Sequence, residues 1–175
     1  PKDENELQHM VYSALAYGHP AAIRFPKGKG TGVAMDDRPT ILPLGKSEML
    51  KEGKDLLLAL GNMVNPALEA AEELETRGIS LAVVNARFAK PLDEERILEF
   101  AEPGRTIITA EEGVLAGGFG SAVREFLDRE RRFGVRFLEI GLPLGVYPAG
   151  KAKKIRELYG LDPQGLASRI AEFYK

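Results

Sequence analysis

The residues best suited to chemistry begin with a cluster of cations in a glycine-rich segment. The string I-R-F-P-K-G-K-G places Arg24, Lys27 and Lys29 around a Pro-Gly bend. Cations beside exposed glycine backbone can hold a phosphate, because their charges and the backbone N–H groups converge on one anion. The glycine spacing is not that of a Walker A loop, and a solvated linker has the same composition. The segment on its own favours a surface linker, with phosphate binding as the alternative.

Two adjacent carboxylates, Glu111 and Glu112, end a predicted strand. Paired carboxylates can act as acid and base or bind a metal ion. Neighbouring residues of an extended strand point to opposite faces, however, so we expect no cooperating pair. We expect instead that one of the two carboxylates accepts hydrogen bonds from backbone N–H groups of the loop that follows.

A second glycine-rich string, G-G-F-G, follows at residues 117–120. It lacks the G-x-G-x-x-G spacing of dinucleotide-binding loops, and no acidic residue follows at the distance that binds a ribose. The string therefore predicts a helix that begins tightly and packs close to a strand.

The remaining polar residues form no recognisable catalytic set. Arg87 follows Asn85 at the end of a predicted strand, which indicates a buried or interface ion pair, with contact to a ligand or a neighbouring domain as the alternative. His9 and His19 have no acidic partner at metal-ligand spacing, and no Ser-His-Asp arrangement is visible. We predict no catalytic residue and no metal ligand here, as in one part of an enzyme whose chemistry lies elsewhere.

The elements that must position these residues alternate between strands and helices. Apolar runs predict strands at 55–60, 81–85, 106–110 and 135–140, a short strand at 21–25 and an antiparallel edge strand within 44–51. Amphipathic segments predict helices at 3–17, 62–78, 93–101, 117–131, 151–159 and 163–174. The expected N-caps of the first three are Asp3 or Asn5, Asn65 or Asn62, and Asp93. Strands separated by helices pair in parallel through right-handed crossovers, and continuous apolar runs are typical of strands covered on both faces. The prediction is an α/β fold in three layers, with a mostly parallel sheet of about five strands, one antiparallel edge strand and helices on both faces.

Composition narrows the class of protein further. The chain has 175 residues, 44% of them hydrophobic, and a net charge of -2 with both signs interspersed, which gives no case for nucleic acid or membrane partners. The absence of cysteine excludes disulfides and thiolate chemistry and fits a cytoplasmic protein. No apolar run approaches the roughly 20 residues that span a bilayer. Because the first residue is Pro1, we expect a piece of a longer chain.

Five strings in order carry a resemblance that covers nearly the whole chain. They are P-K-D-E-N-E-L-Q-H-M, A-A-I-R-F-P-K-G, V-V-N-A-R-F-A-K-P-L-D, E-E-G-V-L-A-G-G-F-G-S-A-V and I-G-L-P. Together they resemble the C-terminal part of the 1-deoxy-D-xylulose-5-phosphate synthases, which are transketolase-like thiamine diphosphate enzymes. The resemblance implies that residues 1–30 are the tail of a pyrimidine-binding domain, 31–41 a linker, and 42–175 a transketolase C-terminal domain.

The resemblance also implies an activity for the full-length protein. The family condenses pyruvate with glyceraldehyde 3-phosphate and releases CO2, as a homodimer that uses thiamine diphosphate and Mg2+. The product feeds isoprenoid, thiamine and pyridoxal synthesis. Upstream domains bind the cofactors in this family, so we expect no cofactor on this part of the chain and no activity from it alone.

Two substrate-binding residues follow from the family's R-Y-P-R-G string. Its second basic residue, which holds the phosphate of the acceptor aldehyde, corresponds to Lys27, and its first corresponds to Arg24, which we expect to support the loop. Lysine keeps the charge but loses the bidentate geometry of arginine. Phe25 replaces the usual tyrosine, and V-Y-P-A-G-K at 146–151 replaces a more polar turn, which leaves the role of that loop open.

Two other interpretations remain open. The first is the C-terminal domain of a 2-oxoacid dehydrogenase β-chain, which docks an acyltransferase, although the R-F-P-K-G string fits the synthases better. The second is a non-catalytic module for dimerisation or regulation, which agrees with the lack of a complete active site.

Overall fold

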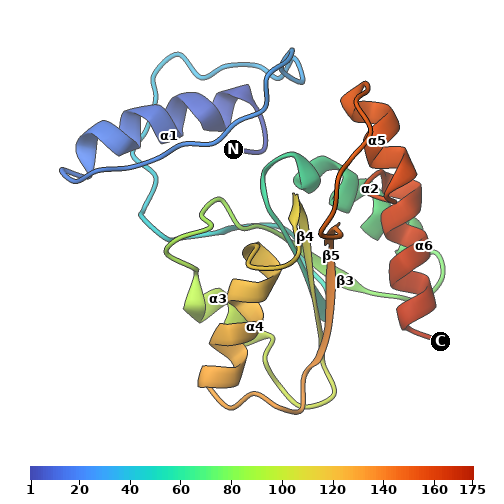
Figure 1. The fold of residues 1–175 in the computed structure, drawn as a ribbon. Helices are drawn as coiled ribbons and strands as arrows, with labels where there is room; N and C mark the ends of the chain where they lie inside the picture. Colours follow the sequence, from blue (N-terminus) through green and yellow to red (C-terminus); the bar gives the residue numbers. More distant parts are fainter.

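The computed structural model describes residues 1–175 and centres on a five-stranded sheet (Figure 1). The strand order is β1-β3-β2-β4-β5, and every pair is parallel except β1 with β3. The strands are β1 (Glu48–Lys51), β2 (Asp55–Ala59), β3 (Leu81–Asn85), β4 (Thr106–Val114) and β5 (Arg136–Leu142). The predicted α/β sheet and its antiparallel edge strand are confirmed.

Helices cover both faces of this sheet and create two separate apolar clusters. On one face, α2 (Val64–Glu75) and α6 (Pro163–Phe173) pack against residues such as Leu57 and Val83. On the other face, α3 (Glu94–Glu99) and α4 (Phe119–Arg129) pack against residues such as Leu56 and Val84. The central strands are fully buried because alternate side chains enter the two clusters, which explains their continuous apolar sequence.

The helix starts agree with the predicted capping residues at two of three positions. Asp3 accepts a hydrogen bond from the Glu6 N–H at the start of the first helix, and Asp93 accepts one from the Arg96 N–H at the start of α3. The predicted asparagine cap of α2 was wrong. Residues 61–63 form a short 3-10 turn, and α2 begins without a side-chain cap, while the Asn62 amide donates to Glu112.

The first helix, α1 (Glu4–Ala16), lies apart from the two helical layers and above the carboxyl ends of the strands (Figure 1). Asp3 caps it by accepting from the Glu6 N–H at 2.7 Å. Residues 31–42 return along α1 and are bonded to it, for example through Thr31 to Glu4 and Leu42 to Ser13. The predicted loop is therefore fastened to the helix.

The predicted strand at residues 21–25 was wrong, because these residues adopt no regular structure. None of the backbone hydrogen bonds of the sheet involves them, since the strands near them already pair with one another. A short apolar run without a neighbouring strand edge cannot satisfy its backbone groups as a strand. The remaining helix, α5 (Ala152–Leu158), has no buried residue.

Candidate functional site

A cavity of about 620 Å³ lies between the N-terminal segment and the carboxyl ends of β2, β3 and β4. Its walls include Asn62 after β2, Arg87 after β3, and both Glu111 and Glu112 on β4. On the opposite side it is lined by α1 and by residues 20–26. Parallel strands bring their carboxyl ends to one edge of a sheet, which is where open α/β folds bind ligands. This cavity is therefore the candidate site.

The two predicted substrate-binding residues lie differently with respect to this cavity. Arg24 lines it, together with Phe25 and Pro26, whereas Lys27 is exposed just beyond it. Neither the Arg24 guanidinium nor the Lys27 ammonium forms a hydrogen bond or ion pair with the protein. Both cations are thus available to an anion, and Arg24 is the one at the cavity wall.

Arg87 forms the ion pair that its position at a strand end predicted. Its Nε donates to Glu6 at 2.8 Å, and its guanidinium lies 3.0 Å from a carboxylate oxygen of Glu48 on β1. The Glu6 carboxylate also accepts from the fully buried Asn85 amide at 2.6 Å. This cluster joins α1 to the amino end of β1 and the carboxyl end of β3, across 81 residues of sequence between Glu6 and Arg87.

The same cluster explains two unusual properties of its members. Burial opposes ionisation of Glu6, which is only 2% exposed, yet its pKa lies below the usual value because Arg87 and the Lys2 N–H donate to it. Arg87 itself has φ of 58°, a conformation that costs a non-glycine residue about 1–3 kcal/mol. Its backbone N–H donates to the Asn85 side chain at 3.2 Å, which helps to hold that conformation.

Glu111 confirms the expectation that one of the paired carboxylates serves the backbone. Its two oxygens accept from the N–H groups of Phe119 at 3.0 Å and Gly120 at 2.9 Å, at the start of α4. The G-G-F-G string permits this approach, because a Cβ at Gly118 would lie 2.3 Å from the Val114 carbonyl oxygen. The glycines therefore make a tight helix start, as predicted.

Glu112 has partners that the sequence did not indicate. Asn62 donates to it at 2.7 Å, and the Nε of Arg156 on α5 donates to it at 2.9 Å. Arg156 lies 44 residues away along the chain, so no local pattern connects the two. The two glutamates thus have separate surroundings and make no cooperating dyad.

The histidines contribute no metal site. His9 does have an acidic partner that the spacing did not reveal, since its Nε2 lies 2.9 Å from Asp36, while its Nδ1 accepts from the Thr40 N–H. No group of three or more His, Asp or Glu side chains that could hold a metal ion is present. None of the helices combines the length and apolar character needed to cross a bilayer.

Comparisons with known proteins agree with this architecture. The family described as "Transketolase, C-terminal domain" matches residues 45–166. A 1-deoxy-D-xylulose-5-phosphate synthase of Geobacter metallireducens is 49% identical over all of this chain, and one of Geobacter sulfurreducens is 50% identical over 97% of it. In both cases the chain spans only 28% of the relative.

A solved structure supports the same assignment. The inactive β4 tetramer of a split-gene transketolase is 34% identical, with a TM-score of 0.67 over 76% of this chain and 43% of that one. The family match extends over more than half of the present sequence. The chain therefore belongs to the transketolase C-terminal domain family, and along its whole length it is similar to 1-deoxy-D-xylulose-5-phosphate synthases.

Proposed function

We propose that this chain is the C-terminal part of a cytoplasmic, homodimeric 1-deoxy-D-xylulose-5-phosphate synthase. The full-length enzyme would condense pyruvate with glyceraldehyde 3-phosphate and release CO2, on the route to isoprenoids and thiamine. The observation that carries the proposal is 49% identity to such a synthase across the whole of this chain. In this proposal, residues 1–30 end the pyrimidine-binding domain, 31–41 form the linker and 42–175 are the C-terminal domain.

The proposed contribution of this chain is to position the phosphate of the acceptor. Lys27 and Arg24 carry unpaired positive charges beside the cavity at the carboxyl ends of the strands. Such cations bind a phosphate through charge-assisted hydrogen bonds, and fixing the phosphate orients the reacting aldehyde. Thiamine diphosphate, bound by other domains, would supply the carbanion chemistry of the reaction. The 175-residue piece alone would be inactive.

An activity assay on the full-length protein tests this function. With thiamine diphosphate and Mg2+ present, CO2 release from pyruvate is measured with and without glyceraldehyde 3-phosphate. We expect release that depends on the aldehyde, together with a five-carbon sugar phosphate. Release without aldehyde dependence, accompanied by acyl transfer to a lipoyl acceptor, would assign the chain to the 2-oxoacid dehydrogenase β-chains instead.

A second function, assembly without catalysis, is supported by one comparison. The related split-gene transketolase is described as an inactive β4 tetramer, so a chain of this kind associates without being active. Sedimentation of residues 42–175 tests this role. A stable dimer of that piece would support an assembly function for the C-terminal domain, whereas a monomer would assign pairing to the upstream domains.

A further inference from the structure

The charged residues that line the cavity differ in whether other groups of the protein neutralise them. Its cations include Arg24 and Lys90, both exposed and neither engaged in a hydrogen bond or ion pair, and Arg87, which pairs with two carboxylates. Its anions are Glu111 and Glu112. Glu111 is compensated by backbone N–H groups and Glu112 by Arg156, none of which lines the cavity, so the unpaired cations leave the cavity a net attraction for negative charge.

Glu111 is compensated by the protein backbone. Its carboxylate accepts from two N–H groups at the start of α4, a helix of 11 residues whose amino end carries a partial positive charge. This arrangement is fixed by the fold, and the side chain is only 5% exposed.

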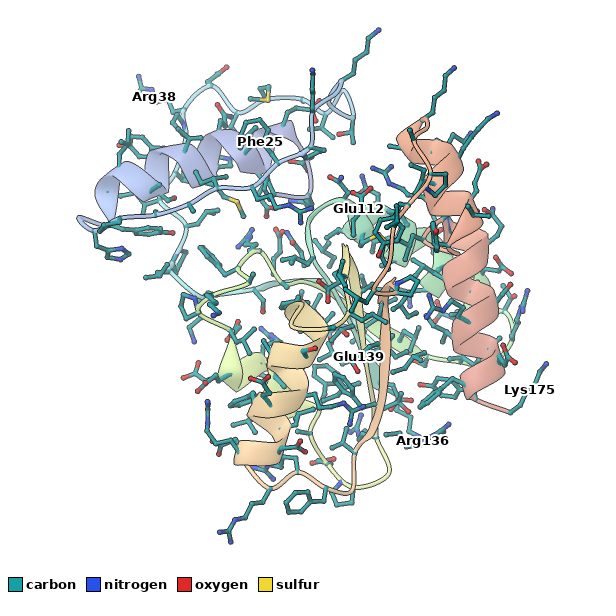
Figure 2. All side chains as sticks on the ribbon, in the orientation of Figure 1. Phe25, Arg38, Glu112, Arg136, Glu139 and Lys175 are labelled. Carbon is teal, nitrogen blue, oxygen red and sulfur yellow. The ribbon has the colours of Figure 1, made fainter.

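Glu112 is compensated by a single charged side chain. Arg156 donates to one carboxylate oxygen from Nε at 2.9 Å and to the other from a terminal nitrogen at 3.4 Å. The Asn62 amide adds a neutral hydrogen bond at 2.7 Å. Arg156 does not line the cavity itself, because it approaches Glu112 from α5 (Figure 2 shows Glu112 at the end of β4 nearest to α5). Without Arg156, Glu112 would present an uncompensated negative charge to the cavity.

The geometry points to Arg156 as a specificity-determining residue that acts through Glu112. By neutralising this carboxylate, Arg156 keeps the cavity suited to a phosphate-bearing acceptor without touching the acceptor. The inference rests on the proposed function and deepens it. It assigns to α5, a helix with no buried residue, a part in the electrostatics of the site.

Two substitutions separate this electrostatic role from a purely structural one. Arg156→Gln and Glu112→Gln both break the ion pair, but they change the charge beside the cavity in opposite directions. In the full-length holoenzyme at saturating pyruvate, we expect Arg156→Gln to raise the KM for glyceraldehyde 3-phosphate by about three- to tenfold. We expect Glu112→Gln to lower that KM, and the double variant to return it close to the unmodified value.

Matched variants complete the experiment. Arg156→Lys keeps the charge and should keep the KM near its original value. Arg129→Gln removes an arginine that pairs with Glu94, and because neither residue lines the cavity it should leave the KM unchanged. Thermal unfolding of each variant establishes that it is folded. If Arg156→Gln and Glu112→Gln both raise the KM, or if neither changes it, the electrostatic role is overturned. That result differs from failure of the proposed function, in which the unmodified enzyme itself shows no aldehyde-dependent release of CO2.

Discussion

The hydroxyl of Tyr174, just after α6, donates a hydrogen bond of 2.7 Å to the carboxylate of Asp55, the first residue of β2. The other oxygen of this carboxylate accepts from the Thr106 N–H at 2.8 Å, at the start of β4. The pair therefore ties the end of α6 to the amino ends of β2 and β4, at the opposite ends of these strands from the cavity.

Loss of this hydroxyl should destabilise the fold. Because Tyr174→Phe leaves the buried carboxylate of Asp55 with one partner fewer, we expect the free energy of unfolding to fall by about 1–2 kcal/mol. Urea unfolding at pH 7 measures the change. An unchanged urea midpoint would show that water replaces the hydroxyl without cost.

The same tyrosine predicts a pH dependence. Burial, followed by the hydrogen bond with Asp55 and the negative charge of that residue, raises the pKa of Tyr174 above its usual range. The folded state therefore keeps this proton when the unfolded state loses it, near pH 10. The stabilisation is complete below about pH 10 and is lost as the pH rises further. In urea titrations, the stability difference between the unmodified protein and Tyr174→Phe should accordingly be constant between pH 8 and pH 9 and narrow above about pH 10.

The buried cluster around Glu6 predicts that the stability of the fold depends on pH in the acidic range. Glu6→Gln removes one of the two carboxylates that Arg87 contacts, so we expect a loss of about 3 kcal/mol at pH 7. The pKa of Glu6 is lowered in the folded state, so its stabilisation is present above about pH 4.5 and is lost as the pH falls. The difference in the free energy of unfolding between the unmodified protein and Glu6→Gln should therefore shrink toward pH 3.

An exposed carboxylate provides the control for that comparison. Glu95 pairs with Lys46 but has a side chain that is 83% exposed, so Glu95→Gln should leave the unfolding midpoint nearly unchanged. Equal losses for Glu6→Gln and Glu95→Gln would contradict the importance of burial in the cluster.

The close packing of the glycines at the start of α4 predicts that a larger residue there destabilises the fold. A methyl group at Gly118 would meet the Val114 carbonyl oxygen and the Glu111 carboxylate, so Gly118→Ala should cost about 1–3 kcal/mol. Gly28→Ala is the matched control, because nothing lies within 4 Å of a Cβ at that position. Thermal unfolding of the two variants gives the comparison, and similar midpoints would argue against the close approach.

The proposed phosphate site predicts a selective effect on substrate binding. In the full-length enzyme, Lys27→Ala and Arg24→Ala should each raise the KM for glyceraldehyde 3-phosphate by about tenfold, as expected for a lost charge-assisted hydrogen bond. The KM for pyruvate should change far less, since that substrate carries no phosphate. Steady-state kinetics with each substrate varied in turn measures both values, and equal increases would remove both residues from the phosphate site.

Much of the fold was predictable because its strands are strongly apolar and separated by amphipathic helices. The bounds of β3 were predicted to the residue, and Asp93 was identified as a cap, since both depend on neighbours in the sequence. The segment 21–25 was misassigned because strand formation depends on a partner, which periodicity does not reveal.

Less of the candidate site could be predicted from the sequence. The paired glutamates and Arg87 could be located at strand ends, but their partners lie far away along the chain. Glu6 is 81 residues from Arg87, and Arg156 is 44 residues from Glu112. Only the three-dimensional arrangement shows which charges neutralise one another, so the electrostatic character of the cavity had to come from the structure.

The bonded return of residues 31–42 along α1 has a mechanical consequence. Tyr17 and Ser13 hold Leu42, Lys46 pairs with Asp93 and Glu95, and Asp93 holds Ser47. Only residues 43–45 of the connection between α1 and the sheet therefore have no hydrogen bond or ion pair to either. Any movement of α1 relative to the sheet would therefore carry residues 31–42 with it. Such a movement would have to break the ion pair between Glu6 and Arg87, so this ion pair fixes α1 in place over the cavity.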